Sequence, residues 1–175
     1  MSPLFSIYTD ASFSKQGLLA VSGFLLFRNK EEQEAGPSPE SFLRTQAFPE
    51  TTNLRAEIKG VLWALGEVGE QIRKRREVGE EKVEIHLYTD CQGVAQLLAR
   101  RKKLEASGFK SRRKKERLSQ ADLYEAFFAL YDQWLPKIFW VKGHASRKYQ
   151  DVIQRNFNWI DKRVRRELRE KMNLR

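Results

Sequence analysis

The order of apolar and polar residues predicts three strands in the first part of the chain. Residues 4–11 alternate between apolar and polar side chains, which is the pattern of a strand with one buried face. Residues 18–28 are rich in Leu, Val and Phe and predict a second strand that forms a hairpin with the first. Residues 29–41 are acidic and contain glycine and proline, so we expect a solvated loop inserted before a third strand at residues 42–48.

The sequence after the third strand predicts helices that alternate with two further strands. The most regular pattern covers residues 54–77, where apolar side chains recur every three or four positions after a Thr-Thr-Asn segment that can cap a helix. The other expected elements are a strand at 82–89, helices at 92–100 and 122–134, a strand at 137–141 and a helix at 155–172. This order predicts an α/β fold with a five-stranded mixed sheet, in which a hairpin meander leads into parallel crossover units and helices cover both faces. We expect a single domain over residues 1–175.

The charge of the chain is positive and concentrated in one segment. Lys and Arg number 33 against 23 Asp and Glu, which gives a formal net charge of +10. This balance is typical of proteins that bind polyanions, with nucleic acid as the first partner to consider. Ten Lys or Arg and two Glu lie between Arg100 and Arg117, so this basic protrusion alone carries +8. By itself, such a run is more often a solvated face than a binding site.

The sequence shows no feature of a secreted or membrane protein. The first residues lack the pattern of a secretory signal, and no stretch approaches 18 uninterrupted apolar residues. The single cysteine, Cys91, excludes an internal disulfide and a cysteine-rich zinc site. We therefore expect a soluble, cytoplasmic monomer without a membrane partner.

Four acidic residues stand where a sheet and its helices would bring them together. The triplet Tyr-Thr-Asp occurs twice, ending at Asp10 and Asp90, each time at the end of a predicted strand. If these strands are parallel neighbours, the two aspartates lie side by side at the carboxyl edge, where α/β sheets form their sites. Glu57 lies in the first turn of the 54–77 helix, and Asp161 lies on the apolar face of the last helix, where a carboxylate needs a partner.

Clustered carboxylates favour a divalent cation, because burying several negative charges together is costly until a cation neutralises them. Oxygen ligands without a cluster of Cys or His indicate a hard ion, Mg²⁺ first and Mn²⁺ second. Two such ions about 4 Å apart can activate a water molecule and stabilise the leaving oxygen of a phosphodiester. Each acid alone also has an ordinary explanation at a strand end or helix start, so the prediction rests on their combination.

Four short motifs around these acids resemble those of type 1 ribonuclease H, in the same order and over nearly the whole chain. The family's motifs are Thr-Asp-Gly-Ser, Thr-Asn-x-Arg-x-Glu-Leu, Thr-Asp-Ser-Gln and Trp-Val-x-Gly-His. Their counterparts are Thr9-Asp10-Ala11-Ser12, Thr52-Asn53-Leu54-Arg55-Ala56-Glu57-Ile58, Thr89-Asp90-Cys91-Gln92 and Trp140-Val141-Lys142-Gly143-His144. The resemblance implies a ribonuclease H-like fold and an endonuclease that hydrolyses the RNA strand of an RNA/DNA hybrid.

The resemblance also implies roles for individual residues. His144 would be an auxiliary group that assists proton transfer or product release. The basic protrusion would contact phosphates, because many family members carry a basic protrusion there that grips the DNA strand. The ligands of the two Mg²⁺ ions would be Asp10, Glu57, Asp90 and Asp161. The residues that contact nucleic acid would be Ser12, Asn53, Gln92, Lys110, Arg112, Arg113 and Lys114.

Two positions depart from the family pattern close to the acids. Ala11 replaces the usual Gly, and Phe157 stands four residues before Asp161 where the family usually has Asn, with an Asn on either side of it. Asp151 is therefore an alternative fourth ligand. However, a Val-Arg-Arg-Glu-Leu run of the kind that normally carries the ligand follows Asp161 and does not follow Asp151.

Two other functions remain compatible with this fold. A non-catalytic nucleic-acid-binding protein is one, because a fold does not determine an activity. The retained acids and His144 favour the enzyme over this alternative. A DNA-directed nuclease or recombinase of the wider superfamily would share the acids, but less often Asn53, Gln92 and the motif that ends at His144.

Overall fold

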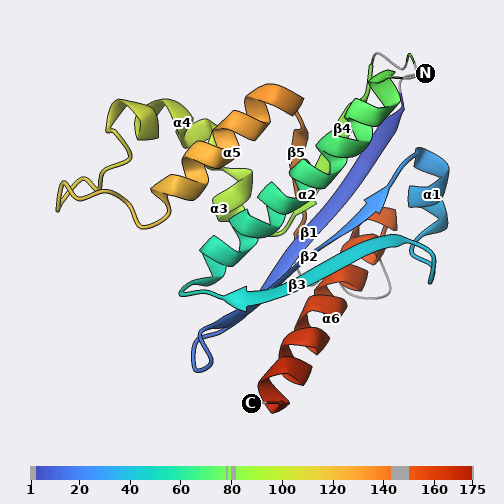
Figure 1. Cartoon of the computed structure of the whole chain (residues 1–175), viewed down its shortest axis with the longest axis horizontal. Coiled ribbons are helices and arrows are strands. Elements are labelled where there is room, and N and C mark those ends of the chain that lie inside the picture. Colours follow the sequence, from blue (N-terminus) through green and yellow to red (C-terminus); the bar gives the residue numbers. More distant parts are fainter. Residues whose placement is uncertain (1–2, 78, 80–81, 143–149, 175) are drawn as a thin grey trace.

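The described part of the chain forms one five-stranded sheet with helices packed against it (Figure 1). The computed structural model describes residues 3–77, 79, 82–142 and 150–174. Its strands are β1 (Leu4–Ser14), β2 (Leu19–Phe27), β3 (Phe42–Pro49), β4 (Glu84–Thr89) and β5 (Lys137–Trp140). Its helices are α1 (Lys30–Ala35), α2 (Asn53–Glu77), α3 (Gln92–Ala95), α4 (Leu97–Ala106), α5 (Ala121–Trp134) and α6 (Val152–Asn173). None of the helices within these described ranges is long and apolar enough to cross a membrane.

The sheet has the strand order β3-β2-β1-β4-β5 and contains both strand directions. β1, β2 and β3 form an antiparallel meander, whereas β4 pairs in parallel with β1 and β5 pairs in parallel with β4. The parallel ladder between β1 and β4 ends at the pair Tyr8–Tyr88, so Asp10 and Asp90 stand just past the last paired residues. The predicted α/β class and five-stranded mixed sheet are confirmed.

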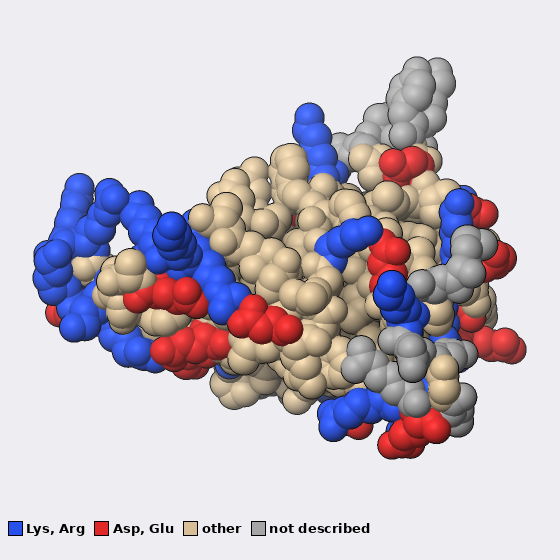
Figure 2. Space-filling view, turned by 90° about the horizontal axis from the view of Figure 1, so that it is seen from above, with Lys and Arg blue, Asp and Glu red and all other residues tan. Residues whose placement is uncertain are grey.

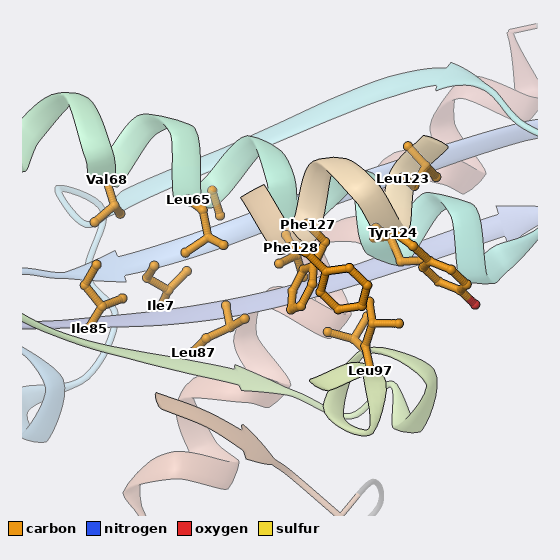
Figure 3. Close-up of a cluster of buried hydrophobic side chains, with 14 of the residues drawn as sticks. Ile7, Leu65, Val68, Ile85, Leu87, Leu97, Leu123, Tyr124, Phe127 and Phe128 are labelled. Atoms are coloured by element: carbon orange, nitrogen blue, oxygen red, sulfur yellow. The ribbon is translucent and has the colours of Figure 1, made fainter. Parts of the chain in front are cut away.

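The two faces of the sheet carry separate hydrophobic cores, because neighbouring residues of a strand point to opposite faces. On one face, α2 and α5 pack on the sheet, and Ile7 and Leu65 belong to the same buried cluster (Figure 3). On the other face, α6 packs on the sheet, and Tyr8 is buried together with Ile160 and Val164. Helices therefore cover both faces, as the sequence predicts.

Gly23 allows α6 to pack closely on β2. A Cβ atom at this position would lie 2.9 Å from the side chains of Ile160 and Val164, which is closer than such atoms can pack without movement. Gly23 also pairs with Asp10 across the antiparallel ladder of β1 and β2. The same close packing therefore brings Asp161, which directly follows Ile160, toward Asp10.

The acidic segment before β3 differs from the expected loop, because it contains the helix α1. Asn29 caps this helix by accepting a hydrogen bond from the backbone N of Glu32 at 2.8 Å, and Gly36 ends it with a φ of +87°. Gln33 is the buried residue of the helix. A helix that buries one glutamine has no apolar stripe, and this explains why the periodicity of residues 29–41 did not predict it.

The helix expected at residues 92–100 is two helices, α3 and α4, which are separated at Gln96. Gln96 has a φ of −92° and a ψ of 0°, in the bridge region between helical and extended backbone. α4 then continues to Ala106, beyond the expected end. The first part of the basic protrusion is therefore helical.

Candidate metal centre and nucleic-acid interface

Three carboxylates from three different elements meet at one end of the sheet. Asp10 belongs to β1, Glu57 to the beginning of α2, and Asp90 follows the end of β4. Each residue offers one oxygen atom, and these three atoms lie within 4.8 Å of one another. Asp10 and Glu57 are buried, whereas Asp90 is partly exposed. A spacing of this size allows the three carboxylates to share a cation.

The two aspartates are aligned by the strands that precede them. Tyr8 and Tyr88 are partners in the parallel ladder, and their rings stack with centroids 4.6 Å apart. Each aspartate follows its tyrosine by two residues, so both leave the ladder in the same register. Trp140 of β5 donates a hydrogen bond from Nε1 to the backbone oxygen of Asp90 at 3.1 Å. This contact ties the segment after β4 to the neighbouring strand.

Glu57 is oriented by polar contacts at the beginning of α2. Asn53, the first residue of the helix, donates from Nδ2 to Glu57 Oε1 at 3.4 Å. Ser22 of β2 donates from Oγ to the backbone oxygen of Ala56 at 2.7 Å, in a buried contact. This bond holds the first turn of α2 on the sheet. Asn53 therefore has a positioning duty, in addition to the predicted contact with nucleic acid.

Sequence reasoning missed a group of charged residues that anchors the same helix. Glu50 is buried, although it is a carboxylate, and it accepts a hydrogen bond from Arg55 Nε at 3.1 Å. Lys59 also pairs with Glu50. Arg55 extends further to Asp122 at the beginning of α5, with 3.1 Å between Nη1 and Oδ1. Arg55 belongs to the second family motif, so the sequence did mark this residue. No motif or spacing in the sequence marks Glu50 or Asp122.

The buried carboxylates have oxygen atoms that no residue in the described part of the chain satisfies. Asp10 Oδ2 and Glu57 Oε2 are buried and have no hydrogen-bond partner among the described residues. Burial and the nearby charges of Glu57 and Asp90 raise the pKa of the Asp10 carboxyl well above its usual value. Burial and the charge of Asp90 also raise the pKa of the Glu57 carboxyl. A divalent cation would coordinate these oxygen atoms and offset the repulsion, so the residues present fit such an ion.

Asp161 lies near this cluster but not within it. Its charge contributes to the raised pKa of the Asp10 carboxyl, after burial and the charges of Glu57 and Asp90. Its own carboxylate pairs with Arg165, one turn further along α6, with 2.7 Å between Oδ1 and Nε. We expected the Asp161 carboxylate to have a partner, and the structure shows that this partner is an arginine of the same helix.

The beginning of α6 contains Phe157, the position at which the chain departs from the family motif. Phe157 is buried in the core between α6 and the sheet. Asn156 is fully buried and donates from Nδ2 to the backbone oxygen of Gln33 at 2.9 Å, which joins α6 to α1. Asp151 is exposed and caps α6 by accepting a hydrogen bond from the backbone N of Gln154 at 2.8 Å. Asp151 thus has an ordinary structural duty.

The other predicted contact residues occupy different positions around the cluster. Ser12 lies on β1 two residues past Asp10, on the same face of the strand, and is partly buried. Gln92 is exposed as the first residue of α3. His144 lies outside the described residues. Burial raises the pKa of the Cys91 thiol to about 11, so its reactive thiolate form is disfavoured at neutral pH.

The basic protrusion consists of α4 and the loop that leads toward α5, on the left of Figures 1 and 2. Phe109 anchors it, because this side chain is buried in the core beside Phe128. Lys110 and Arg117 form an antiparallel bridge that closes the loop. Arg117 pairs with Glu125 of α5 at 2.5 Å. The protrusion is therefore a defined part of the fold.

The outer part of this loop presents its charges to solvent. Figure 2 shows Lys and Arg side chains gathered over the protrusion. Acidic partners of the protrusion lie at its base, where Arg101 bonds Asp132 of α5 with 2.7 Å between Nη2 and Oδ2. Within the described ranges, no ion pair involves the four cations at the tip. Lys115 is exposed in this loop as well, and the four tip cations are Lys110, Arg112, Arg113 and Lys114.

Most of the chain matches the model of a known protein family. The model of the RNase H family matches residues 3–165. A ribonuclease H of Desulforamulus reducens is 35% identical over 101 residues, which cover 57% of this chain and 56% of that protein. A ribonuclease HI of Synechocystis is 27% identical over 155 residues, which cover 86% of this chain and 82% of that protein. The chain thus spans little more than half of the first relative and most of the second.

Solved structures agree on the fold. LC9-RNase H1, described as a type 1 RNase H with the type 2 active-site motif, has a TM-score of 0.64 at 18% identity, with 93% of this chain and 70% of that chain covered. The foamy viral protease-reverse transcriptase in complex with RNA/DNA hybrid has a TM-score of 0.61 at 14% identity, with 94% and 20% covered. Together with the match to the family model, these findings confirm the predicted kinship: the chain belongs to the RNase H family.

Proposed function

We propose that this protein is an endonuclease that hydrolyses the RNA strand of RNA/DNA hybrids with two divalent cations. The observation that carries the proposal is the cluster of Asp10, Glu57 and Asp90 with its buried, unsatisfied oxygen atoms. Membership of the RNase H family and relatives named ribonuclease H support the same activity. Oxygen-only ligands favour Mg²⁺, with Mn²⁺ as a substitute.

The proposed roles follow from the position of each carboxylate. Asp10, Glu57 and Asp90, whose oxygen atoms lie within 4.8 Å of one another, would hold the ions. Asp161 would complete the set if its carboxylate turned from Arg165 toward the cluster. When bound, the ions would supply an activated water molecule and stabilise the leaving oxygen of the phosphodiester. His144 would assist proton transfer or product release.

The chain's other residues would hold the substrate against this site. Asn53 and Gln92 carry amide side chains that can bond base edges or the 2′-hydroxyl that distinguishes RNA from DNA. Ser12 lies on the same strand as Asp10 and would contact the backbone of the nucleic acid. The exposed cations of the basic protrusion would bind phosphates of the DNA strand. The foamy viral structure named above, which shares the fold, was solved with RNA/DNA hybrid.

One assay tests the proposal with a matched set of substrates. Hybrid, double-stranded RNA and duplex DNA of one sequence, each labelled on one strand, are incubated with Mg²⁺, Mn²⁺ or a chelator. We expect cleavage of the RNA strand of the hybrid with either ion and none with the chelator. Binding without cleavage of any substrate would favour the non-catalytic protein, and preferred cleavage of duplex DNA would favour the DNA-directed nuclease. A monomer and a cytoplasmic location remain predictions from the sequence.

A further inference from the structure

A second basic surface lies on α6, separate from the basic protrusion. A groove of about 670 Å³ runs between the outer side of α6 and the segment that leads into β3, together with the first residues of β3. Five of its lining residues are cations, and none is a carboxylate. These cations are Arg44, Lys162, Arg163, Arg166 and Arg169. The sequence alone does not mark this surface, because the cations of α6 are interspersed with acids along the chain.

Residues of α6 that are neighbours in the sequence lie on three different sides of the folded helix. Ile160 and Val164 face the sheet, and Asp161 and Arg165 pair with each other on a second side. Positions 159, 162, 166 and 169 are spaced by three or four residues and form a stripe on a third side, along the groove, with position 163 beside it. The groove therefore lies on a different side of α6 from the residue proposed as fourth metal ligand.

The cations of the groove are available to an anionic ligand. Lys162 and Arg169 are exposed, and neither has an ion-pair partner among the described residues. Arg163 and Arg166 approach acids of their own helix only at 3.9 and 3.8 Å. Exposed pairs of this length are weak, so a phosphate can replace them at little cost.

Trp159 indicates which polyanion fits. Its indole lines the groove, and 48% of its surface is exposed beside the cations. An aromatic face within a basic groove binds single-stranded nucleic acid, because bases stack on the ring while cations hold the phosphates. The stripe from Trp159 to Arg169 is about 15 Å long at 1.5 Å per residue. This length matches about four stacked nucleotides at roughly 3.4 Å each.

We propose that the groove between α6 and the segment before β3 binds single-stranded nucleic acid, about four nucleotides long, apart from the carboxylate cluster. Phosphates would contact Lys162, Arg166 and Arg169, and one base would stack on Trp159. The stacking face is the reason to prefer a nucleic acid over an acidic protein segment, which would need the cations alone. Neither the metal ions nor cleavage is required for this binding.

The test measures binding of a labelled 12-nucleotide oligothymidylate by fluorescence anisotropy, in chelator, over a series of salt concentrations. The groove variant is Lys162→Gln/Arg166→Gln/Arg169→Gln. Its control is Lys30→Gln/Arg73→Gln/Lys74→Gln, which removes the same charge from exposed positions elsewhere. We expect the groove variant to lower the slope of log affinity against log salt by about 2 units, at roughly 0.7 per lost phosphate contact on a single strand. The control variant should keep the slope of the wild-type protein.

Trp159 provides an independent arm of the test. Trp159→Leu should weaken binding about tenfold at an unchanged salt slope, and Trp159→Phe should recover part of the loss. Melting temperatures of all variants show that each protein is folded. Three results would overturn the proposal: equal slopes for the groove and control variants, no effect of Trp159→Leu, or competition by polyglutamate as effective as that by oligothymidylate. Loss of all oligothymidylate binding on neutralising the protrusion tip would also overturn it.

Discussion

The carboxylate cluster is largely buried, whereas the tip of the basic protrusion is exposed. The two regions therefore differ in how precisely their atoms must be positioned. Asp10 and Glu57 are buried, come from a strand and a helix, and have oxygen atoms without a hydrogen-bond partner among the residues that the structure describes. The tip of the protrusion is exposed, and the protrusion is connected to the core through Leu104 and Phe109. The cluster needs atoms placed within a fraction of an ångström, whereas the protrusion needs only its charge near the phosphates.

This contrast has a physical cause. Charges that are buried together interact strongly, because little water screens them, so the loss of one carboxylate changes the behaviour of all. Exposed charges are screened by salt and act almost independently. Substitutions in the cluster should therefore have large and non-additive effects on the rate. Substitutions in the protrusion should have small and additive effects on binding.

The largest expected effect is that of Asp10→Asn. This change removes one charge of the cluster but keeps the shape of the side chain, so the fold and the affinity for hybrid should persist. Loss of a proposed metal ligand would remove several kcal/mol of transition-state stabilisation, so the cleavage rate should fall by about a thousandfold. Single-turnover cleavage of labelled hybrid measures the rate. Substantial residual turnover in this variant would contradict the proposed two-ion mechanism.

A smaller effect is expected for Asp161→Asn, because Asp161 stands beside the cluster and pairs with Arg165. The cleavage rate should fall about 10- to 100-fold, and high Mg²⁺ or Mn²⁺ should restore part of it. Asp151→Asn is the matched control, since Asn caps a helix as well as Asp does and should leave the rate nearly unchanged. If Asp151→Asn is the more damaging change, the assignment of the fourth ligand is wrong.

Neutralising the tip of the protrusion should act on binding and spare the chemical step. The variant with Lys110, Arg112, Arg113 and Lys114 all changed to Gln should raise KM several-fold and change kcat little. Its salt dependence should flatten by about 0.9 units of slope for each lost phosphate contact on a duplex. The control removes four exposed charges elsewhere, at Lys30, Arg73, Lys74 and Lys82. Identical slopes for wild type and tip variant would show that the protrusion is a solvated face.

The smallest expected effect is on the pH dependence of stability without metal. The pKa of the Glu57 carboxyl is raised from 4.5 to about 8, chiefly by burial. A raised pKa in the folded state means that the stability which neutral Glu57 contributes is complete below pH 4.5 and is lost as the pH rises through 8. In chelator, the melting temperature of the wild-type protein should therefore fall by several degrees relative to Glu57→Gln between pH 5 and pH 9. Parallel curves for the two proteins would contradict the raised pKa, and Mg²⁺ should reduce the wild-type decline.

Much of the site could be predicted because its residues stand in regular elements. Alternation in two strands placed Asp10 and Asp90 in the same register, and the parallel ladder between Tyr8 and Tyr88 confirms this. The period of the 54–77 helix placed Glu57 at its beginning. The pattern of apolar and polar residues predicted these positions, because burial repeats every two residues in a strand and every three or four in a helix.

Other features had no local signature. Glu50 and Asp122 meet at Arg55 although 72 residues of chain separate them. Asn156 reaches the backbone of Gln33 from the opposite end of the chain, and α1 was expected as a loop. These contacts depend on how helices pack on the two faces of the sheet, and no periodicity within one segment encodes that packing.

The sequence by itself determined the α/β class, the five strands, the order of the acidic motifs and the kinship with ribonuclease H. Only the tertiary structure decided that Asp161 pairs with Arg165, that Gly23 brings α6 close to Asp10, and that the cations of α6 line a separate groove. The physical reason is that side-chain periodicity reports which side of an element is buried. The distance between two elements, and so the partner of each charge, is set by the packing of side chains far apart in the chain.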